Sequence, residues 1–275
     1  MNNPATTVDQ GQVAAKHRAM WASGDYPKLA ADLVSPLGPV LVQALGVAPG
    51  DRVLDVAAGT GNAAIPAAEA GASVVASDLC PELLESGRTL AADRGVDLEW
   101  REANAHELPF ADDEFDVVMS CIGVMFAPFH QLAADQLIRV AKPGGRIGVI
   151  SWTPEGHIGQ LWATMKPYAP PPPPGAQPPP LWGNEEHVTA LLGDDVTDVV
   201  AQRRMLKVTH FADGAAFRDY FKATYGPTIA VYRNIEGDAD RVAELDAAIA
   251  RVGDDVLQGE SDMEWEYLLL TARKA

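Results

Sequence analysis

The sequence predicts a single α/β domain built on a mostly parallel β-sheet, and three observations support this class. Short apolar runs of strand length alternate with helix-forming stretches over about residues 50 to 152 of the 275-residue chain. Residues 53–56 form such a run, and a turn containing Gly59 and Gly61 and an alanine-rich stretch follow it. A second apolar run ends in Asp78, as expected at the edge where parallel strands bind ligands.

Apolar periodicity and the glycine and proline stops give the expected elements in order. Helices are expected over residues 13–45 with a break at Gly24-Asp25, then over 63–70, from about 81, and over 131–140, 159–168, 182–193, 215–225 and 241–252. Strands are expected over residues 53–56, 72–78, 96–102, 115–121, 146–152, 196–211 with an interruption at 202–204, and 263–272. Residues 1–12 are expected to be disordered. Residues 170–180 carry eight prolines and indicate a polyproline-II connector or a stiff loop.

Composition excludes several classes of protein. Asp and Glu number 38 against 21 Lys and Arg, and the formal net charge of -17 would repel nucleic acid and anionic membranes unless a local basic patch overrides it. Cys80 and Cys121 are too few for a disulfide framework or a structural zinc site. The polar start and the lack of an 18-residue apolar run predict a cytoplasmic protein without membrane insertion.

The glycine turn permits two interpretations. Gly59-x-Gly61-x-x-Ala64, with Asp78 lying 17 residues after Gly61, satisfies the loose dinucleotide fingerprint of nicotinamide-dependent dehydrogenases. However, Asp55 adds a carboxylate inside the preceding strand, where a pyrophosphate would be repelled and an ammonium or sulfonium group attracted. The acid therefore favours a cationic ligand.

Four motifs in order resemble those of a known family. Asp55, Ala57, Gly59 and Gly61 resemble the first motif of class I S-adenosylmethionine (SAM) dependent methyltransferases, with Ala57 in place of the commoner glycine. The phrases at 108–110, 115–118 and 137–145 are similar to those of the UbiE-like, or type 11, branch. The resemblance implies a Rossmann-like fold with seven strands in the order 3-2-1-4-5-7-6, the last antiparallel. We expect Ala57 at negative φ, where a methyl group is tolerated.

The resemblance also implies the cofactor-binding positions, with SAM bound and S-adenosylhomocysteine released. Asp78 would accept the ribose hydroxyls, although it could instead cap the helix that begins near Pro81. Leu79 would face the adenine, and Asn104-Ala105 stands where the family often has Asp-Ala, although Asn104 could simply bond its own loop. Cys121, at the end of the fourth strand, is either a cofactor neighbour or a buried filler. Trp21 and Tyr26 would cover the methionine end or merely pack the N-terminal helix on the sheet.

We therefore expect methyl transfer to a small, apolar or aromatic substrate by direct in-line displacement, without a metal. Residues 1–45 would form a helical lid, 46–152 the SAM-binding core, 153–262 a cap with a late strand, and 263–275 the terminal strand. If a general base exists, His130 is the first candidate; alternatively, its ring lies in solvent. A nicotinamide-dependent dehydrogenase and a SAM-binding regulatory protein without turnover remain the alternatives.

Overall fold

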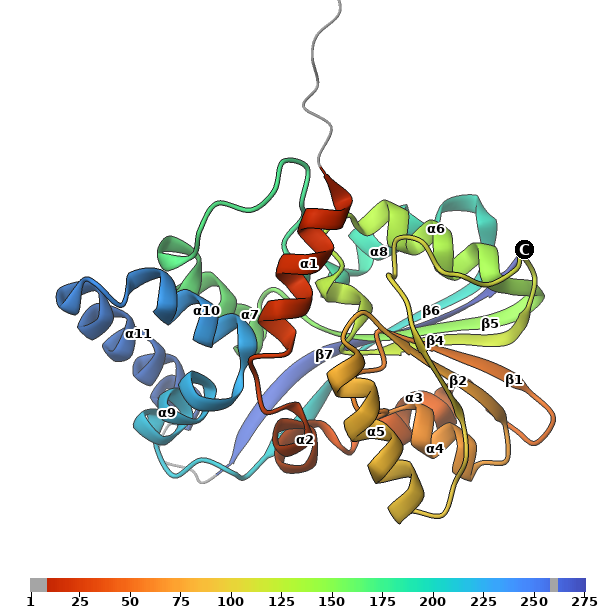
Figure 1. The fold of residues 1–275 in the computed structure, drawn as a ribbon, viewed down its shortest axis with the longest axis horizontal. Helices are drawn as coiled ribbons and strands as arrows, with labels where there is room; N and C mark the ends of the chain where they lie inside the picture. Colours follow the sequence, from red (N-terminus) through yellow and green to blue (C-terminus); the bar gives the residue numbers. More distant parts are fainter. Residues whose placement is uncertain (1–8, 258–261) are drawn as a thin grey trace, which may run out of the picture.

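A seven-stranded sheet forms the centre of the computed structural model, which describes residues 9–257 and 262–275 (Figure 1). The strand order is β3-β2-β1-β4-β5-β7-β6, as predicted, and β7 runs antiparallel to both of its neighbours. The strands are β1 (Arg52–Val56), β2 (Ser73–Asp78), β3 (Glu99–Glu102), β4 (Phe115–Cys121), β5 (Ala141–Trp152), β6 (Val196–Val208) and β7 (Met263–Lys274).

Helices cover both faces of the sheet, and a group of helices extends beyond its edge (Figure 1). They are α1 (Gln10–Trp21), α2 (Tyr26–Leu29), α3 (Leu37–Ala44), α4 (Ala64–Glu69), α5 (Pro81–Asp93), α6 (His130–Val140), α7 (His157–Met165), α8 (Glu185–Leu192), α9 (Gly214–Thr224), α10 (Gly226–Ile235) and α11 (Ala239–Leu257). Helices α3, α4 and α5 lie on one face, and α6 and α8 on the other. Helices α7, α9, α10 and α11 form the outlying group, and α1 lies across the front of the molecule.

The sheet reverses its strand order beside β1, and this reversal positions the site. Strand β1 pairs in parallel with β2 on one side and with β4 on the other. The chain therefore leaves β1 and β4 toward opposite faces, which opens a crevice at their carboxyl ends. Residues 53–56 of β1 are all buried, as expected for a strand covered by helices on both faces.

Several predicted boundaries were wrong. Strand β6 is not interrupted at 202–204; its irregularity lies between Thr197 and Val200, where Asp198 adopts φ +51°. Helix α9 ends at Thr224, and Gly226-Pro227 is the first turn of α10. Helix α10 was not predicted, because this pair was treated only as a helix stop although proline is favoured in a first helical turn. The helical stretch predicted over 13–45 breaks at Gly24-Asp25 as expected, but its second part is divided further into α2, a π-helical turn and α3. Of the stretch predicted as disordered, residues 1–8 lie outside the described residues, and 10–12 are helical.

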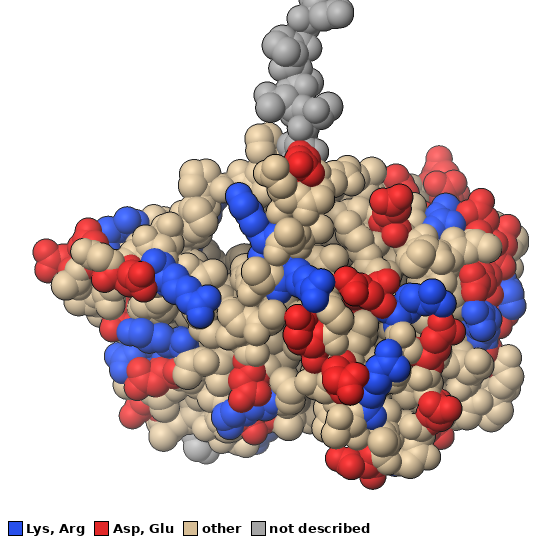
Figure 2. Space-filling model, viewed as in Figure 1, with Lys and Arg blue, Asp and Glu red and all other residues tan. Residues whose placement is uncertain are grey.

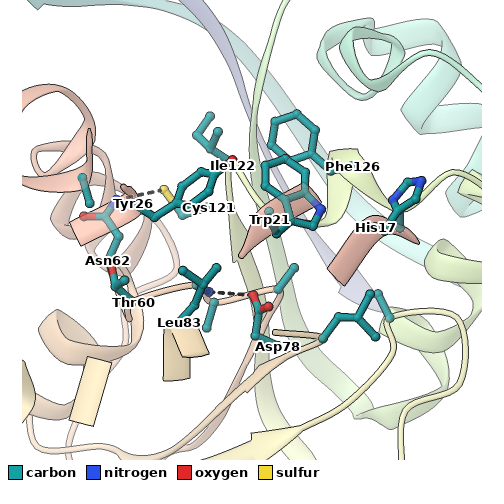
Figure 3. Close-up of a pocket in the computed structure, with 18 of the residues that line it drawn as sticks. His17, Trp21, Tyr26, Thr60, Asn62, Asp78, Leu83, Cys121, Ile122 and Phe126 are labelled. Atoms are coloured by element: carbon teal, nitrogen blue, oxygen red, sulfur yellow. Dashed lines mark hydrogen bonds between the residues drawn. The ribbon is translucent and has the colours of Figure 1, made fainter. Parts of the chain in front are cut away.

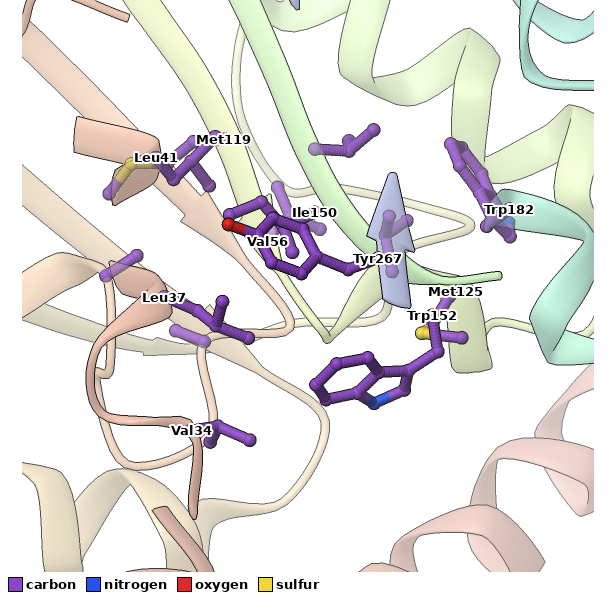
Figure 4. Close-up of a cluster of buried hydrophobic side chains, with 14 of the residues drawn as sticks. Val34, Leu37, Leu41, Val56, Met119, Met125, Ile150, Trp152, Trp182 and Tyr267 are labelled. Atoms are coloured by element: carbon purple, nitrogen blue, oxygen red, sulfur yellow. The ribbon is translucent and has the colours of Figure 1, made fainter. Parts of the chain in front are cut away.

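Helix α3 is packed on the sheet by fully buried side chains. Leu37 and Leu41 are 1% and 0% exposed and lie with Met119 and Ile150 in the core cluster (Figure 4). Each such side chain contributes roughly 1.5–3 kcal/mol on burial. A Cβ at Gly38, on the same helix, would lie 1.8 Å from the Asn62 carbonyl oxygen, so glycine permits the close approach of α3 to the turn after β1.

Candidate functional site

A pocket opens at the carboxyl ends of β1, β2 and β4, and α1 covers it (Figure 3). Nine of the predicted site residues line it, namely Trp21, Tyr26, Ala57, Gly59, Asp78, Leu79, Asn104, Ala105 and Cys121. Asp55, Gly61 and His130 do not contribute to its lining. Figure 2 shows the surface hollowed beside α1, where acidic and basic side chains are interspersed without a continuous basic patch on this face.

The turn after β1 uses the left-handed backbone conformation three times. Gly59 and Gly61 have φ of +57° and +86°, and Ala57 has φ of +55°. The prediction of negative φ at Ala57 was therefore wrong. A left-handed alanine is unfavourable by about 1–2 kcal/mol. The fold supports it by close packing, because a Cβ at Gly123 would lie 2.2 Å from the Ala57 carbonyl oxygen.

Asp78 braces this turn from the end of β2. Its Oδ2 accepts from the Gly59 N–H at 2.8 Å, and its Oδ1 accepts from the Cys80 N–H at 2.8 Å. The second bond supports the entry to α5, although Cys80 and not Asp78 occupies the N-cap. Burial raises the pKa of the Asp78 carboxyl to about 6, against the lowering effect of these N–H groups. A carboxylate has about four lone-pair positions, so positions remain for a ligand.

Asp55 carries a buried carboxyl group without a hydrogen bond of ordinary geometry. It is 1% exposed, and neither oxygen has a partner. Burial raises the pKa of this group to about 8, opposed by the nearby Ala64 N–H and reinforced by the charge of Asp78. An unpartnered buried carboxyl is unfavourable by several kcal/mol when ionised, so a cationic ligand nearby would compensate it.

The residues that follow β2 and β3 form a second wall. Leu79 and Ala105 line the pocket from these two strand ends. Asn104 also lines it, and its Oδ1 accepts from the His106 N–H at 3.1 Å, so the self-bonding alternative is present. Its amide nitrogen makes no hydrogen bond in the described residues, so it can still donate to a ligand.

Aromatic side chains from four distant segments close the other half of the pocket. The Trp21 ring lies 5.4 Å from Tyr26, 4.6 Å from Phe126 and 6.4 Å from Tyr225, measured between centroids. Trp265 of β7 completes this wall. Such edge and tilted contacts are favourable arrangements of aromatic rings. We call Trp21, Tyr26, Phe126, Tyr225 and Trp265 the aromatic wall.

Among the pocket residues of the described chain, none is a lysine or an arginine. Cys121 lies beside the aromatic wall, and its sulfur receives a 3.7 Å contact from the Asn62 amide. Burial raises the pKa of the Cys121 thiol far above its usual range, which keeps it protonated. The group is therefore no nucleophile at neutral pH.

His130 lies away from the pocket. Its side chain is 0% exposed, and its Nδ1 lies 2.9 Å from Nε2 of His187. Burial, with the neighbouring His187, lowers the pKa of His130 to about 3. The alternative with the ring in solvent was wrong, and the placement gives no support to His130 as a base that touches a ligand.

Sequence reasoning found Trp21 but missed the rest of one face of α1. Gln10, Val13, Ala14 and His17 line the pocket beside Trp21. Their spacing of three and four residues was a readable signal, since such residues share one side of a helix. Thr60, Asn62, Leu83, His106 and Phe126 were also missed, because only the tertiary fold brings these loop and helix residues together.

This sheet order, with a left-handed turn after β1 and an acid at the end of β2, defines the Rossmann-like methyltransferase class. A family model described as a methyltransferase domain matches residues 53–145. An uncharacterized protein of Mycobacterium tuberculosis is 54% identical over 262 residues, which cover 95% of each chain. A demethylmenaquinone methyltransferase of Renibacterium salmoninarum is 40% identical over 114 residues, or 42% of this chain and 46% of the relative. A phosphoethanolamine N-methyltransferase of Haemonchus contortus, solved with SAM, shares the fold with a TM-score of 0.54 at 17% identity, covering 86% of this chain and 52% of that one.

The chain belongs to the class I SAM-dependent methyltransferases, whose cofactor is SAM. The residues present fit this group. Asp78 retains positions for ribose hydroxyls. The unpartnered carboxyl of Asp55 lies behind the pocket lining, where its charge, once ionised, would attract a nearby ammonium without direct contact. A Cβ built at Gly59 would meet nothing within 4 Å, so the turn leaves open space beside a ligand.

No described helix is long and apolar enough to cross a membrane. No group of three or more His, Cys, Asp or Glu side chains in this part of the chain is arranged to hold a metal ion.

Proposed function

We propose that this protein transfers a methyl group from SAM to a small, apolar or aromatic substrate. The observation that carries the proposal is the aromatic wall, which faces the turn after β1 across one pocket that lacks lysine and arginine. A carboxylate or phosphate substrate would find no cation there, whereas a planar apolar compound would find matching surface.

The protein's own residues would mainly hold the two reactants. Asp78 would bind the ribose hydroxyls, Asp55 would lie toward the ammonium, and Asn104 would contact the adenine edge. SAM, when bound, supplies a methyl group already activated on a sulfonium. The aromatic wall would exclude water and orient the substrate, an effect worth up to about 7–11 kcal/mol in well-oriented systems. Neither a covalent intermediate nor a metal is needed.

Residues 1–45 are proposed as the lid and 153–262 as the cap. Helix α1 contains no fully buried residue, although one of its faces lines the pocket. Arg18 ties it to the core through ion pairs with Glu82 at 3.2 Å and Glu102 at 3.4 Å. Both pairs are solvent-exposed and therefore contribute little stability. A lid held so weakly is suited to repeated opening.

The proline segment 170–180 belongs to the proposed cap. Its Gln177 N–H donates to the Pro128 carbonyl at 2.9 Å, beside the pocket. Deleting residues 170–180 should reduce turnover more than SAM affinity, because Pro128 borders the pocket away from the turn after β1. Equal loss of both, or of neither, would contradict a cap function.

Calorimetry with SAM, S-adenosylhomocysteine and NAD tests the cofactor, and a screen of small metabolites for release of S-adenosylhomocysteine tests turnover. We expect binding of the first two ligands, none of NAD, and turnover with neutral aromatic compounds. Binding of NAD instead would favour a dehydrogenase. SAM binding without turnover across neutral, anionic and ammonium-bearing compounds would favour a regulatory protein. A preference for anionic substrates would refute the argument from the pocket's composition.

A further inference from the structure

Two tyrosine hydroxyl groups in the aromatic wall have no acceptor for their protons among the described residues. Tyr26 and Tyr225 both line the pocket, and their ring centroids lie 6.4 Å apart. No residue in the described part of the chain accepts a hydrogen bond from either hydroxyl. Two other tyrosines differ in this respect, because Tyr220 donates to Asp32 at 3.0 Å and Tyr232 donates to Asp246 at 2.6 Å.

The hydroxyl oxygen of Tyr26 accepts a hydrogen bond from the protein backbone, whereas its hydroxyl proton has no acceptor in the described residues. The Gly226 N–H, at the first turn of the ten-residue helix α10, donates to the Tyr26 oxygen at 3.2 Å. This contact polarises the hydroxyl and makes its O–H a stronger donor. Because the Gly226 N–H occupies one lone pair of the oxygen, the rotatable O–H is left free to donate to a group in the pocket.

Tyr225 has a comparable environment. The Tyr225 side chain is 6% exposed. The indole N–H of Trp162 lies near the Tyr225 hydroxyl oxygen, but the two groups do not form a hydrogen bond of ordinary geometry. Burial raises the pKa of both phenols well above 10, so each remains a protonated donor over the whole physiological range. Neither hydroxyl oxygen is among the fully buried polar atoms that lack a partner in the described residues, and both tyrosines line the pocket, so each proton is available to a ligand atom. A hydrogen bond to such an atom contributes about 0.5–1.5 kcal/mol net of the bond to water that it replaces.

We propose that Tyr26 and Tyr225 donate hydrogen bonds to an oxygen of the substrate, which is a planar aromatic compound carrying a phenol or carbonyl group. This inference rests on the proposed function and narrows its substrate class. Purely hydrocarbon compounds would leave both hydroxyl protons unpaired in an otherwise apolar wall. The two tyrosines are thus specificity-determining residues that position the ring, and transfer itself is left to the cofactor and the substrate.

The test compares two probes of the same shape, 2-naphthol and 2-methylnaphthalene, titrated by fluorescence or calorimetry with and without saturating S-adenosylhomocysteine. We expect the protein to prefer 2-naphthol by about two- to tenfold for each hydrogen bond. Tyr26→Phe and Tyr225→Phe should each reduce this preference, and the double variant should abolish it. Affinity for 2-methylnaphthalene and for S-adenosylhomocysteine should stay unchanged in all three variants.

Tyr220→Phe is the matched control, because its hydroxyl has a protein acceptor and it is not a pocket residue. It should keep the full preference for 2-naphthol. The proposal is overturned if the preference survives in the double variant, if neither probe binds, or if both probes weaken equally. Loss of S-adenosylhomocysteine binding in the tyrosine variants, with the probe preference intact, would also overturn it and would assign the hydroxyls to the cofactor. Failure of the wild-type protein to bind S-adenosylhomocysteine would instead refute the proposed function, while the titrations without it would still decide the role of the hydroxyls.

Discussion

Replacing Asp78 should weaken both the fold and the cofactor site, and the two effects can be separated. In Asp78→Ala, the Gly59 and Cys80 N–H groups lose their acceptor. The Cys80 N–H is buried, and leaving it unsatisfied is unfavourable by about 1–3 kcal/mol, whereas the Gly59 N–H borders the pocket and can bond to water. We therefore expect the free energy of unfolding to fall by roughly 1–3 kcal/mol. Urea unfolding monitored by circular dichroism measures this change.

The ribose contact requires a second comparison, because a distorted turn alone would weaken cofactor binding. A charge-assisted hydrogen bond contributes about 1.5–3 kcal/mol, or roughly ten- to hundredfold in affinity. Wild-type protein should therefore prefer S-adenosylhomocysteine over its 2′,3′-dideoxy analogue by at least about tenfold. Asp78→Ala should bind the two ligands equally, although both more weakly than wild type does. Calorimetry at pH 7.5 measures all four affinities.

The pH dependence provides a control for this reasoning. Because the pKa of Asp78 is raised to about 6, its carboxylate should become protonated below that pH. The preference of the wild-type protein for the ribose-bearing ligand should then decline as the pH falls from 7 to 5. A preference that persists in Asp78→Ala, or a wild-type protein that binds both ligands equally, would refute the assignment of Asp78 to the ribose.

Three further predictions concern packing and titration. Gly38→Ala should lower the free energy of unfolding by about 1–3 kcal/mol and weaken SAM binding, because its Cβ would lie 1.8 Å from the Asn62 carbonyl oxygen. Gly237→Ala is the control, because a Cβ there would meet nothing within 4 Å. This variant should change neither stability nor SAM affinity in the same unfolding and binding assays. Burial lowers the pKa of His157 from 6.5 to about 4, so the unfolded chain binds the proton more tightly and stability is lost as pH falls from 6.5 to 4. His157→Phe should remove up to roughly 3 kcal/mol of that loss in unfolding curves across pH, and an unchanged acid limb would contradict this. Since the pKa of Asp55 is about 8, its carboxyl group should lose a proton near pH 7 when an ammonium binds beside it. Calorimetry in buffers of different ionisation enthalpy measures this proton release. The release should be absent in Asp55→Asn.

The sequence predicted the central fold well because its signals there are local. Strands β1, β2 and β4 are short, mostly buried runs, each bounded by a turn or an acid, and they could be located from the sequence. The order of the strands in the sheet followed from the family resemblance. The helical start at Pro81 and the terminal strand were also confirmed. Errors arose where one residue serves two neighbours, as at Tyr225, which is the C-cap of α9 and the N-cap of α10.

The site residues that were predicted lie next to the first strands in the sequence. Gly59 follows β1 and Asp78 ends β2, and the fold joins the two residues through a hydrogen bond. Tyr225 and Trp265 reach the same pocket from segments that follow Asp78 by 147 residues or more, which no local pattern reveals. Ala57 was misjudged because an intrinsic backbone preference of about 1–2 kcal/mol is smaller than the packing that opposes it. His130 was misplaced because position after a strand does not fix the direction of a side chain.

Helix α1 has a consequence for how ligands are retained. Its inner side chains face the pocket, and none of its residues is fully buried by the protein itself. Bound ligands would therefore bury the inner face of α1, which the rest of the domain leaves partly exposed. Ligand binding and the stability of α1 are thus thermodynamically linked. Amide protons of residues 10–21 should exchange rapidly in the free protein and become protected in step with saturation. Hydrogen exchange at this single helix would then act as a site-specific gauge of ligand occupancy, even for a substrate whose identity is not yet known.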